Sequence, residues 1–161
     1  MKLKTKDLAL AGVIAAIYAV VTLLLEPISF GAIQFRVAEA LTILPVAMPA
    51  AIPGLFVGCL VSNIVGSVSW LDIVFGPLAT LVAAILTRYL RKRIFLAPLP
   101  PVLVNALVIG AVLSVTIGNF PFWLAALCVG AGQFGACYAL GLPLLWALRR
   151  LPATITDRWL R

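Results

Sequence analysis

The chain has 161 residues, of which 64% are hydrophobic and only 11% are charged, and its formal net charge is +7. Soluble globular domains are about half apolar and about a quarter charged, so this composition excludes a soluble fold and indicates an integral membrane protein. Because a spanning helix needs about 20 mainly apolar residues, the length accommodates about six spans with short loops. We expect a single integral membrane domain over residues 1–161, with no soluble domain appended.

Apolar runs, interrupted by proline, glycine and charged residues, predict six transmembrane helices. The first is expected to be retained rather than cleaved as a signal peptide, because its apolar run has no small-residue cleavage site. The second and third spans are short and nearly continuous, and Pro45, Pro49 and Pro53 interrupt them, so one bent re-entrant hairpin in a four-span chain is the alternative. The expected fold class is an all-α, polytopic six-transmembrane-helix bundle. Its spans are predicted near residues 7–25, 37–50, 52–68, 72–90, 98–117 and 121–148.

Basic residues gather in three clusters at the ends of the predicted spans. Six crossings put every cluster on the same side, and the positive-inside bias makes that side cytoplasmic. We therefore expect a multi-pass protein of the cell membrane with both termini in the cytoplasm, and residues 151–161 lying along the inner interface. Topology explains the positive charge better than nucleic-acid binding. The clusters are Lys2, Lys4 and Lys6, then Arg88, Arg91, Lys92 and Arg93, and finally Arg149 and Arg150.

Polar side chains at membrane depth are costly, and they face protein or water more often than lipid. Several of them map to the outer ends of the predicted spans and others lie deeper, so together they predict a substrate pocket that opens outward, with an aromatic wall. Three alternatives remain: a local ion pair between Arg36 and Glu39, interhelical hydrogen bonds of the amides, and a helix cap at Asp72. The candidate substrate-binding residues are Gln34, Arg36, Glu39, Asn63, Trp70, Asp72, Asn105 and Gln133.

Small residues recur at four-residue spacing on the first predicted span. Ala11, Ala15 and Ala19 form one row, and Gly12 and Ala16 lie on a neighbouring row. Such rows allow close approach of another helix. They predict either packing inside the bundle or docking of a partner subunit.

Several kinds of catalytic site are absent from the sequence. No histidine is present, which removes serine–histidine dyads, histidine-ligated zinc and HExxH proteolysis. The P-loop pattern GxxxxGK[ST] is also absent, and Asp72 is the only aspartate in the central part of the sequence, so a pair of catalytic aspartates is missing. Cys59, Cys128 and Cys137 lie in apolar segments without metal-ligand spacing. We expect no enzyme activity, no metal and no cofactor.

Four segments carry unusual polar residues and resemble the QueT family: QFRVAEAL at 34–41, PAAIPGL at 49–55, LDIVFG at 71–76 and LPPVLVN at 99–105. The resemblance implies a six-helix substrate-binding S component of an energy-coupling factor transporter. It implies a queuosine precursor or related 7-deazaguanine as cargo, and as partners a transmembrane coupling protein and two ATPases. It also implies that Ala11, Ala15 and Ala19 meet the coupling protein.

Two further functions are weighed against this one. A self-sufficient small secondary transporter or channel usually has repeated halves and ionisable residues at the midplane, whereas here the acids gather near one side. A membrane scaffold that binds no ligand does not need polar groups converging at one end of the bundle.

Overall fold

The computed structural model describes residues 5–30, 34–66 and 69–150. The predicted interfacial placement of residues 151–161, and the basic residues Lys2 and Lys4, lie outside these ranges. The elements in chain order are α1 (Thr5–Leu24), α2 (Glu26–Ser29), the 3₁₀-helix η1 (Val37–Val46), α3 (Ala51–Gly66), α4 (Trp70–Tyr89), the 3₁₀-turn η2 (Leu90–Lys92), α5 (Leu99–Thr116), α6 (Phe122–Phe134), the π-helix η3 (Gly135–Gly141) and α7 (Leu142–Arg149).

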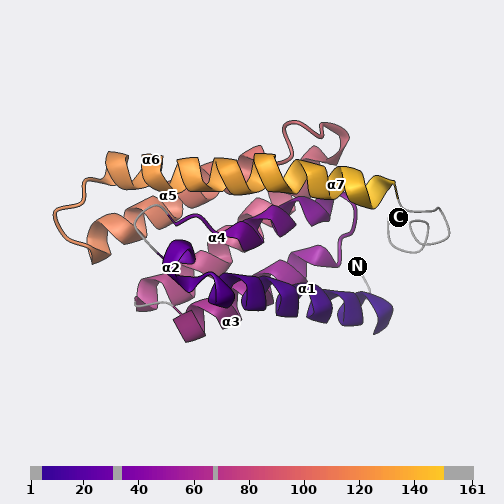
Figure 1. Ribbon diagram of the computed structural model, residues 1–161, viewed down its shortest axis with the longest axis horizontal. Helices are drawn as coiled ribbons and strands as arrows, with labels where there is room; N and C mark the ends of the chain where they lie inside the picture. Colours follow the sequence, from indigo (N-terminus) through magenta and orange to yellow (C-terminus); the bar gives the residue numbers. More distant parts are fainter. Residues whose placement is uncertain (1–4, 31–33, 67–68, 151–161) are drawn as a thin grey trace.

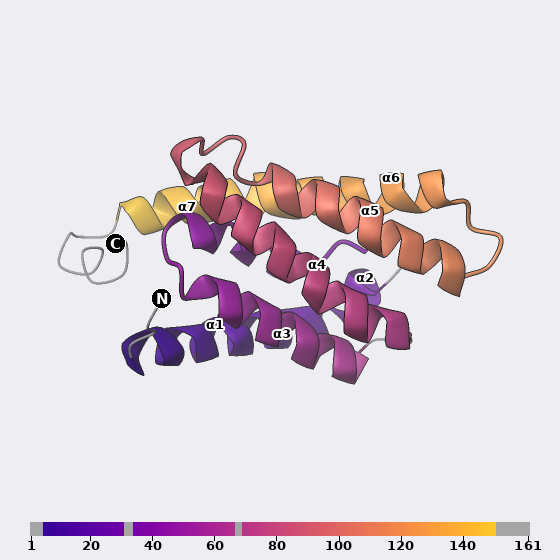
Figure 2. The same cartoon turned by 180° about the vertical axis from the view of Figure 1, so that it is seen from behind.

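The helices lie in two layers along the long axis of the molecule. One layer contains α1 and α3, and the other contains α5 with the long rod formed by α6, η3 and α7 (Figures 1 and 2). Helix α4 joins the layers, since it contacts α3 on one side and α5 on the other. The short η1 lies between them and contacts α1, α4 and η3. The all-α class is confirmed.

With the exception of Arg36, the basic residues that the structure describes lie at one end of this bundle. The start of α1, the connection from α4 to α5 and the end of α7 reach the same end of the long axis, which we call the basic end (Figure 1). These elements carry Lys6, Lys92 and Arg149. At the opposite end lie α2, the start of α4 and the connection from α5 to α6 (Figures 1 and 2).

Four helical stretches are long and apolar enough to cross a membrane: Thr5–Leu24, Trp70–Lys92, Leu99–Thr116 and Phe122–Arg149. The predicted second and third spans are instead the shorter apolar helices η1 and α3, so the count of six spans is not confirmed. A 3₁₀-helix rises about 2.0 Å and an α-helix about 1.5 Å per residue, so η1 and α3 are about 20 and 24 Å long. Both fall short of the roughly 30 Å hydrocarbon core.

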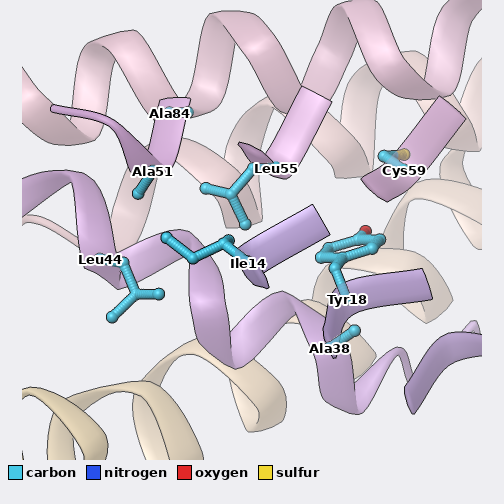
Figure 3. Packing of buried hydrophobic residues seen from close by; sticks show 8 residues of the cluster. All are labelled: Ile14, Tyr18, Ala38, Leu44, Ala51, Leu55, Cys59 and Ala84. Atoms are coloured by element: carbon cyan, nitrogen blue, oxygen red, sulfur yellow. The ribbon is translucent and has the colours of Figure 1, made fainter. Parts of the chain in front are cut away.

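Helices α1 and α3 approach each other closely through small residues. A Cβ atom on Gly54 would lie 2.7 Å from the carbonyl oxygen of Ala11, and one on Gly58 would lie 2.8 Å from that of Ala15. Glycine is therefore required at both positions. Figure 3 shows the apolar cluster that continues this contact, with Ile14 and Tyr18 of α1 near Leu55 of α3. Large apolar side chains on the outer faces are exposed, as expected of helix faces that meet lipid. Examples are Val20, Leu24, Leu107 and Leu127.

Candidate functional site

The predicted polar residues converge inside the bundle. Helix α1 contributes Tyr18, the start of η1 contributes Arg36 and Glu39, and α3, α4, α5 and α6 contribute one residue each. All of these side chains are buried, although several carry formal charge. We call this set the polar cluster. Its members are Tyr18, Gln34, Arg36, Glu39, Asn63, Asp72, Asn105 and Gln133.

Glu39 is 1% exposed and is held from several directions. The hydroxyl of Tyr18 donates to Oε1 at 2.5 Å, and the side chain of Asn105 is close enough to bond to the same carboxylate. The carbonyl oxygen of Glu39 accepts a hydrogen bond from Thr42 Oγ1 at 2.6 Å, and Cys137 Sγ lies 3.6 Å from it. The second carboxylate oxygen, Oε2, is buried and has no hydrogen-bond partner among the described residues. One oxygen is therefore fixed, and the other remains able to accept.

Arg36 is 3% exposed and lies beside this carboxylate without forming a direct salt bridge to it in the described part of the chain. Its Nε donates to the carbonyl oxygen of Ser29 at 3.2 Å, and its guanidinium lies 4.8 Å from the ring centre of Phe30. The guanidinium is close enough to interact electrostatically with both Glu39 and Asp72. Its Nη2 is buried and has no acceptor among the described residues. Arg36 is thus oriented by the backbone and an aromatic face, which leaves donor capacity unused.

Asn63 joins α3 to the first turn of α4. Its Nδ2 donates to the carbonyl oxygen of Asp72 at 2.7 Å, while its Oδ1 is buried and lacks a donor among the described residues. Gly76 packs directly against the Asn63 amide, so a larger residue there would displace it. The side-chain cap of α4 is Ser69, whose Oγ accepts from the Leu71 backbone at 3.2 Å. Asp72 lies one turn in and is buried.

Of the other predicted residues, Gln34 and Gln133 lie at the edges of the cluster, and Trp70 lies outside it. Gln34 is buried, adopts a φ of 46°, and its carbonyl accepts from the Arg36 backbone at 3.0 Å. A non-glycine residue in this left-handed region is strained and is often found at functional sites. Gln133 reaches the cluster through Cys137, whose Sγ is 3.7 Å from its Oε1. Trp70, predicted as a stacking wall, is 70% exposed and is not part of the cluster.

Tyr18, which is a member of the polar cluster, and two residues beside the cluster were not predicted from the sequence. Tyr18 is fully buried, and Cys59 lies between Arg36 Nη1 at 4.0 Å and Thr80 Oγ1 at 3.4 Å. Phe30 makes an aromatic contact with the guanidinium of Arg36. A tyrosine in the middle of an apolar span was the available signal, because its hydroxyl needs a partner when buried.

The row of small residues on α1 is divided between the inside and the outside of the bundle. Ala11, Ala15 and Ala19 are buried, and α3 covers the first two. Gly12 and Ala16 on the neighbouring row are exposed, and nothing lies within 4 Å of a Cβ atom built on Gly12. The small-residue row on the exposed face of α1 is therefore that of Gly12 and Ala16, and the predicted row of Ala11, Ala15 and Ala19 faces the interior.

Comparison with known proteins gives a consistent result. The model of the family described as QueT transporter matches residues 8–150. The chain is 39% identical over 83 residues to the queuosine precursor transporter QueT of Lactococcus lactis subsp. cremoris (strain MG1363). This alignment covers 50% of the chain and 48% of the relative, so it spans about half the length of each. No solved structure matches the chain.

Proposed function

We propose that this chain, which belongs to the QueT transporter family, is the substrate-binding subunit of an energy-coupling factor transporter. Its cargo in this proposal is a queuosine precursor or a related 7-deazaguanine, in line with the printed name of the Lactococcus relative. The subunit itself is not an enzyme. Hydrolysis of ATP belongs to two partner ATPases, which act through a transmembrane coupling protein.

The observation that carries the choice of cargo is the set of unpaired polar atoms in the polar cluster. They include one donor, Arg36 Nη2, and two acceptors, Glu39 Oε2 and Asn63 Oδ1, which have no partner among the described residues. The edge of a guanine-type base presents the complement, namely one carbonyl acceptor and two N–H donor groups. Leaving such atoms unpaired in a buried site costs free energy, so a ligand that pairs them is selected over one that does not.

Electrostatics supports the same cargo. Glu39 Oε2 is buried without a hydrogen-bond partner among the described residues. A cationic aminomethyl arm on the deazaguanine would supply such a partner and favour the carboxylate form. The aromatic face of Phe30 is already occupied by Arg36, so the guanidinium plane is the surface we propose for stacking of the base.

Topology and assembly complete the proposal. The six helical passes α1, η1, α3, α4, α5 and α6–α7 form an S-component bundle, in which η1 and α3 are short passes. The basic end faces the cytoplasm, which places both termini there. The coupling protein docks on the exposed row of Gly12 and Ala16, because small residues allow its helix to approach closely.

Calorimetric titration of the purified chain tests the choice of cargo. We expect tight binding of 7-aminomethyl-7-deazaguanine and weaker binding of the matched 7-aminomethyl-7-deazaadenine. The adenine edge reverses one donor and one acceptor, so its affinity should fall by about tenfold to a thousandfold. Equal affinity for the two bases would contradict the assignment of the unpaired atoms.

Uptake by whole cells tests the dependence on partners. With the coupling protein and ATPases present, labelled deazaguanine should accumulate. Without them the chain should bind but not accumulate the cargo. Accumulation by the chain alone would instead favour the self-sufficient carrier.

A further inference from the structure

A hollow of about 440 Å³ lies at the end of α4, away from the polar cluster. Its lining residues are Arg88, Tyr89, Arg91 and Lys92, so three cations and one phenol surround it. Figure 2 shows that this turn, between α4 and α5, lies at the basic end of the bundle. Like charges repel one another when they are gathered around a cavity, and a bound anion relieves that repulsion.

Arg88 gives the hollow a fixed wall. Its Nη1 donates to the carbonyl oxygens of Pro45 and Val46, at 3.0 Å each. These carbonyls belong to the last residues of η1, so the guanidinium caps that helix and has little freedom. Arg91 and Lys92 follow on η2 and are exposed, so their charged groups are available to a ligand. One cation is thus preorganised, and two others can close on the anion.

The position of the hollow indicates which anion it meets. It lies at the end of an apolar helix long enough to span a membrane. Tyr89 is 79% exposed beside it, and Phe95 on the following connection is 68% exposed. Exposed aromatic residues at the ends of spanning helices lie at the level of lipid head groups. At that depth, the abundant anion is the phosphate of a phospholipid.

We propose that this hollow is a binding site for the phosphate of an anionic phospholipid head group, such as phosphatidylglycerol. A zwitterionic lipid also carries phosphate, but its choline cation would enter a cluster that is already positive. Three cations therefore select a head group with net negative charge. The site is independent of the proposed cargo, because it shares no residue with the polar cluster.

Native mass spectrometry of the purified chain in mixed micelles of phosphatidylglycerol and phosphatidylcholine tests the proposal. The wild-type chain should retain phosphatidylglycerol in preference to phosphatidylcholine. The double variant Arg91→Gln/Lys92→Gln should lose about tenfold or more of that preference. Arg91→Lys, which keeps the charge, should retain most of it.

The matched control is Arg149→Gln/Arg150→Gln, which removes the same charge from the basic end but leaves the hollow intact. It should behave as the wild type. Equal losses in the two double variants would show a nonspecific effect of net charge and would overturn the proposal. Displacement of the lipid by millimolar inorganic phosphate would assign the hollow to a free anion and overturn the lipid assignment. Retention of phosphatidylcholine at the same level as phosphatidylglycerol would overturn it as well.

Discussion

The hydroxyl of Tyr18 donates to Oε1 of Glu39 at 2.5 Å, and this hydrogen bond connects α1 to the first turn of η1. Tyr18 is fully buried, so water does not compete for the bond. It fixes one carboxylate oxygen and leaves Oε2 as the acceptor for a ligand. The same helix carries the exposed row of Gly12 and Ala16 on another face. The proposed docking helix and the proposed substrate carboxylate are therefore directly connected.

Replacing Tyr18 with Phe removes this donor and keeps the aromatic ring that packs in the core. Loss of a hydrogen bond to a buried charged group costs about 1.5 to 3 kcal/mol, so binding of the deazaguanine should weaken by roughly ten- to a hundredfold. Tyr138→Phe is the control, because its hydroxyl donates to the Phe95 carbonyl at 3.1 Å at an exposed site. Calorimetry should show wild-type affinity for Tyr138→Phe. The same result for Tyr18→Phe would refute the positioning role.

Glu39→Gln tests the carboxylate itself. The amide replaces one acceptor with a donor, so ligand N–H groups would face N–H groups and binding should weaken by about 2 to 5 kcal/mol. Asp72→Asn should have a smaller effect, because Asp72 supplies none of the atoms proposed to pair with the cargo and Ser69 caps the helix. Each variant must first show the melting temperature of the wild type, so that a change in affinity is not caused by misfolding. If both variants bind the cargo with wild-type affinity, the carboxylates do not hold it, and Asn63, Asn105 and Gln133 become the main candidates for binding it.

Gly54→Ala tests the contact between α1 and α3. The added Cβ would lie 2.7 Å from the Ala11 carbonyl oxygen, and overpacking of this kind costs about 1 to 3 kcal/mol of folding free energy. Gly12→Ala adds the same methyl group where nothing lies within 4 Å. The melting temperature in detergent should fall for Gly54→Ala and stay unchanged for Gly12→Ala. Equal effects would show that the helices are not packed as described.

Ala16→Trp and Ala15→Trp distinguish the two small-residue rows. Ala16 is exposed, so a bulky side chain there should block docking of the coupling protein and abolish uptake, while the purified chain still binds its cargo. Ala15 is buried under α3, so the same change there should impair folding and binding together. Normal uptake by the Ala16 variant would exclude this row as the docking surface.

Cysteine labelling tests the proposed orientation. Cysteines introduced one at a time at Phe120 and at Lys92, in a Cys128→Ala chain whose remaining Cys59 and Cys137 are buried, should react with a membrane-impermeant maleimide from opposite sides of the membrane. Phe120 lies between α5 and α6, and Lys92 lies at the basic end. Labelling of both from the same side would contradict the proposed topology.

Composition was sufficient to predict an all-α membrane protein, because no soluble core accounts for so few charges. The members of the polar cluster other than Tyr18 were also predictable, since polar groups in apolar spans are costly unless they face protein. Whether the Trp70 side chain faces the pocket or the lipid was not predictable, because an aromatic residue at a helix end suits either place.

The short helices η1 and α3 illustrate a second limit. Hydrophobicity marked both segments, but it does not distinguish a 3₁₀-helix from an α-helix, and so it does not give their length. The α1 rows illustrate a third limit. Ala15 and Ala16 are adjacent and equally small, and only the position of Gly58 on α3 determines which of them is covered.

The π-helix η3 sets the rotational phase of the long rod that contains it. Gln133 and Leu142 are nine positions apart, which in an unbroken α-helix is two and a half turns, so they would point in opposite directions. Yet Gln133 is buried in the polar cluster, and Leu142 is buried with Ile43 in a separate apolar cluster. The wider turn lets both ends of one rod face the interior. Deleting one residue within Gly135–Gly141 would leave Gln133 and Leu142 eight positions apart, about two and a quarter turns of an α-helix, so the rod could wind as an α-helix and keep both ends facing the interior.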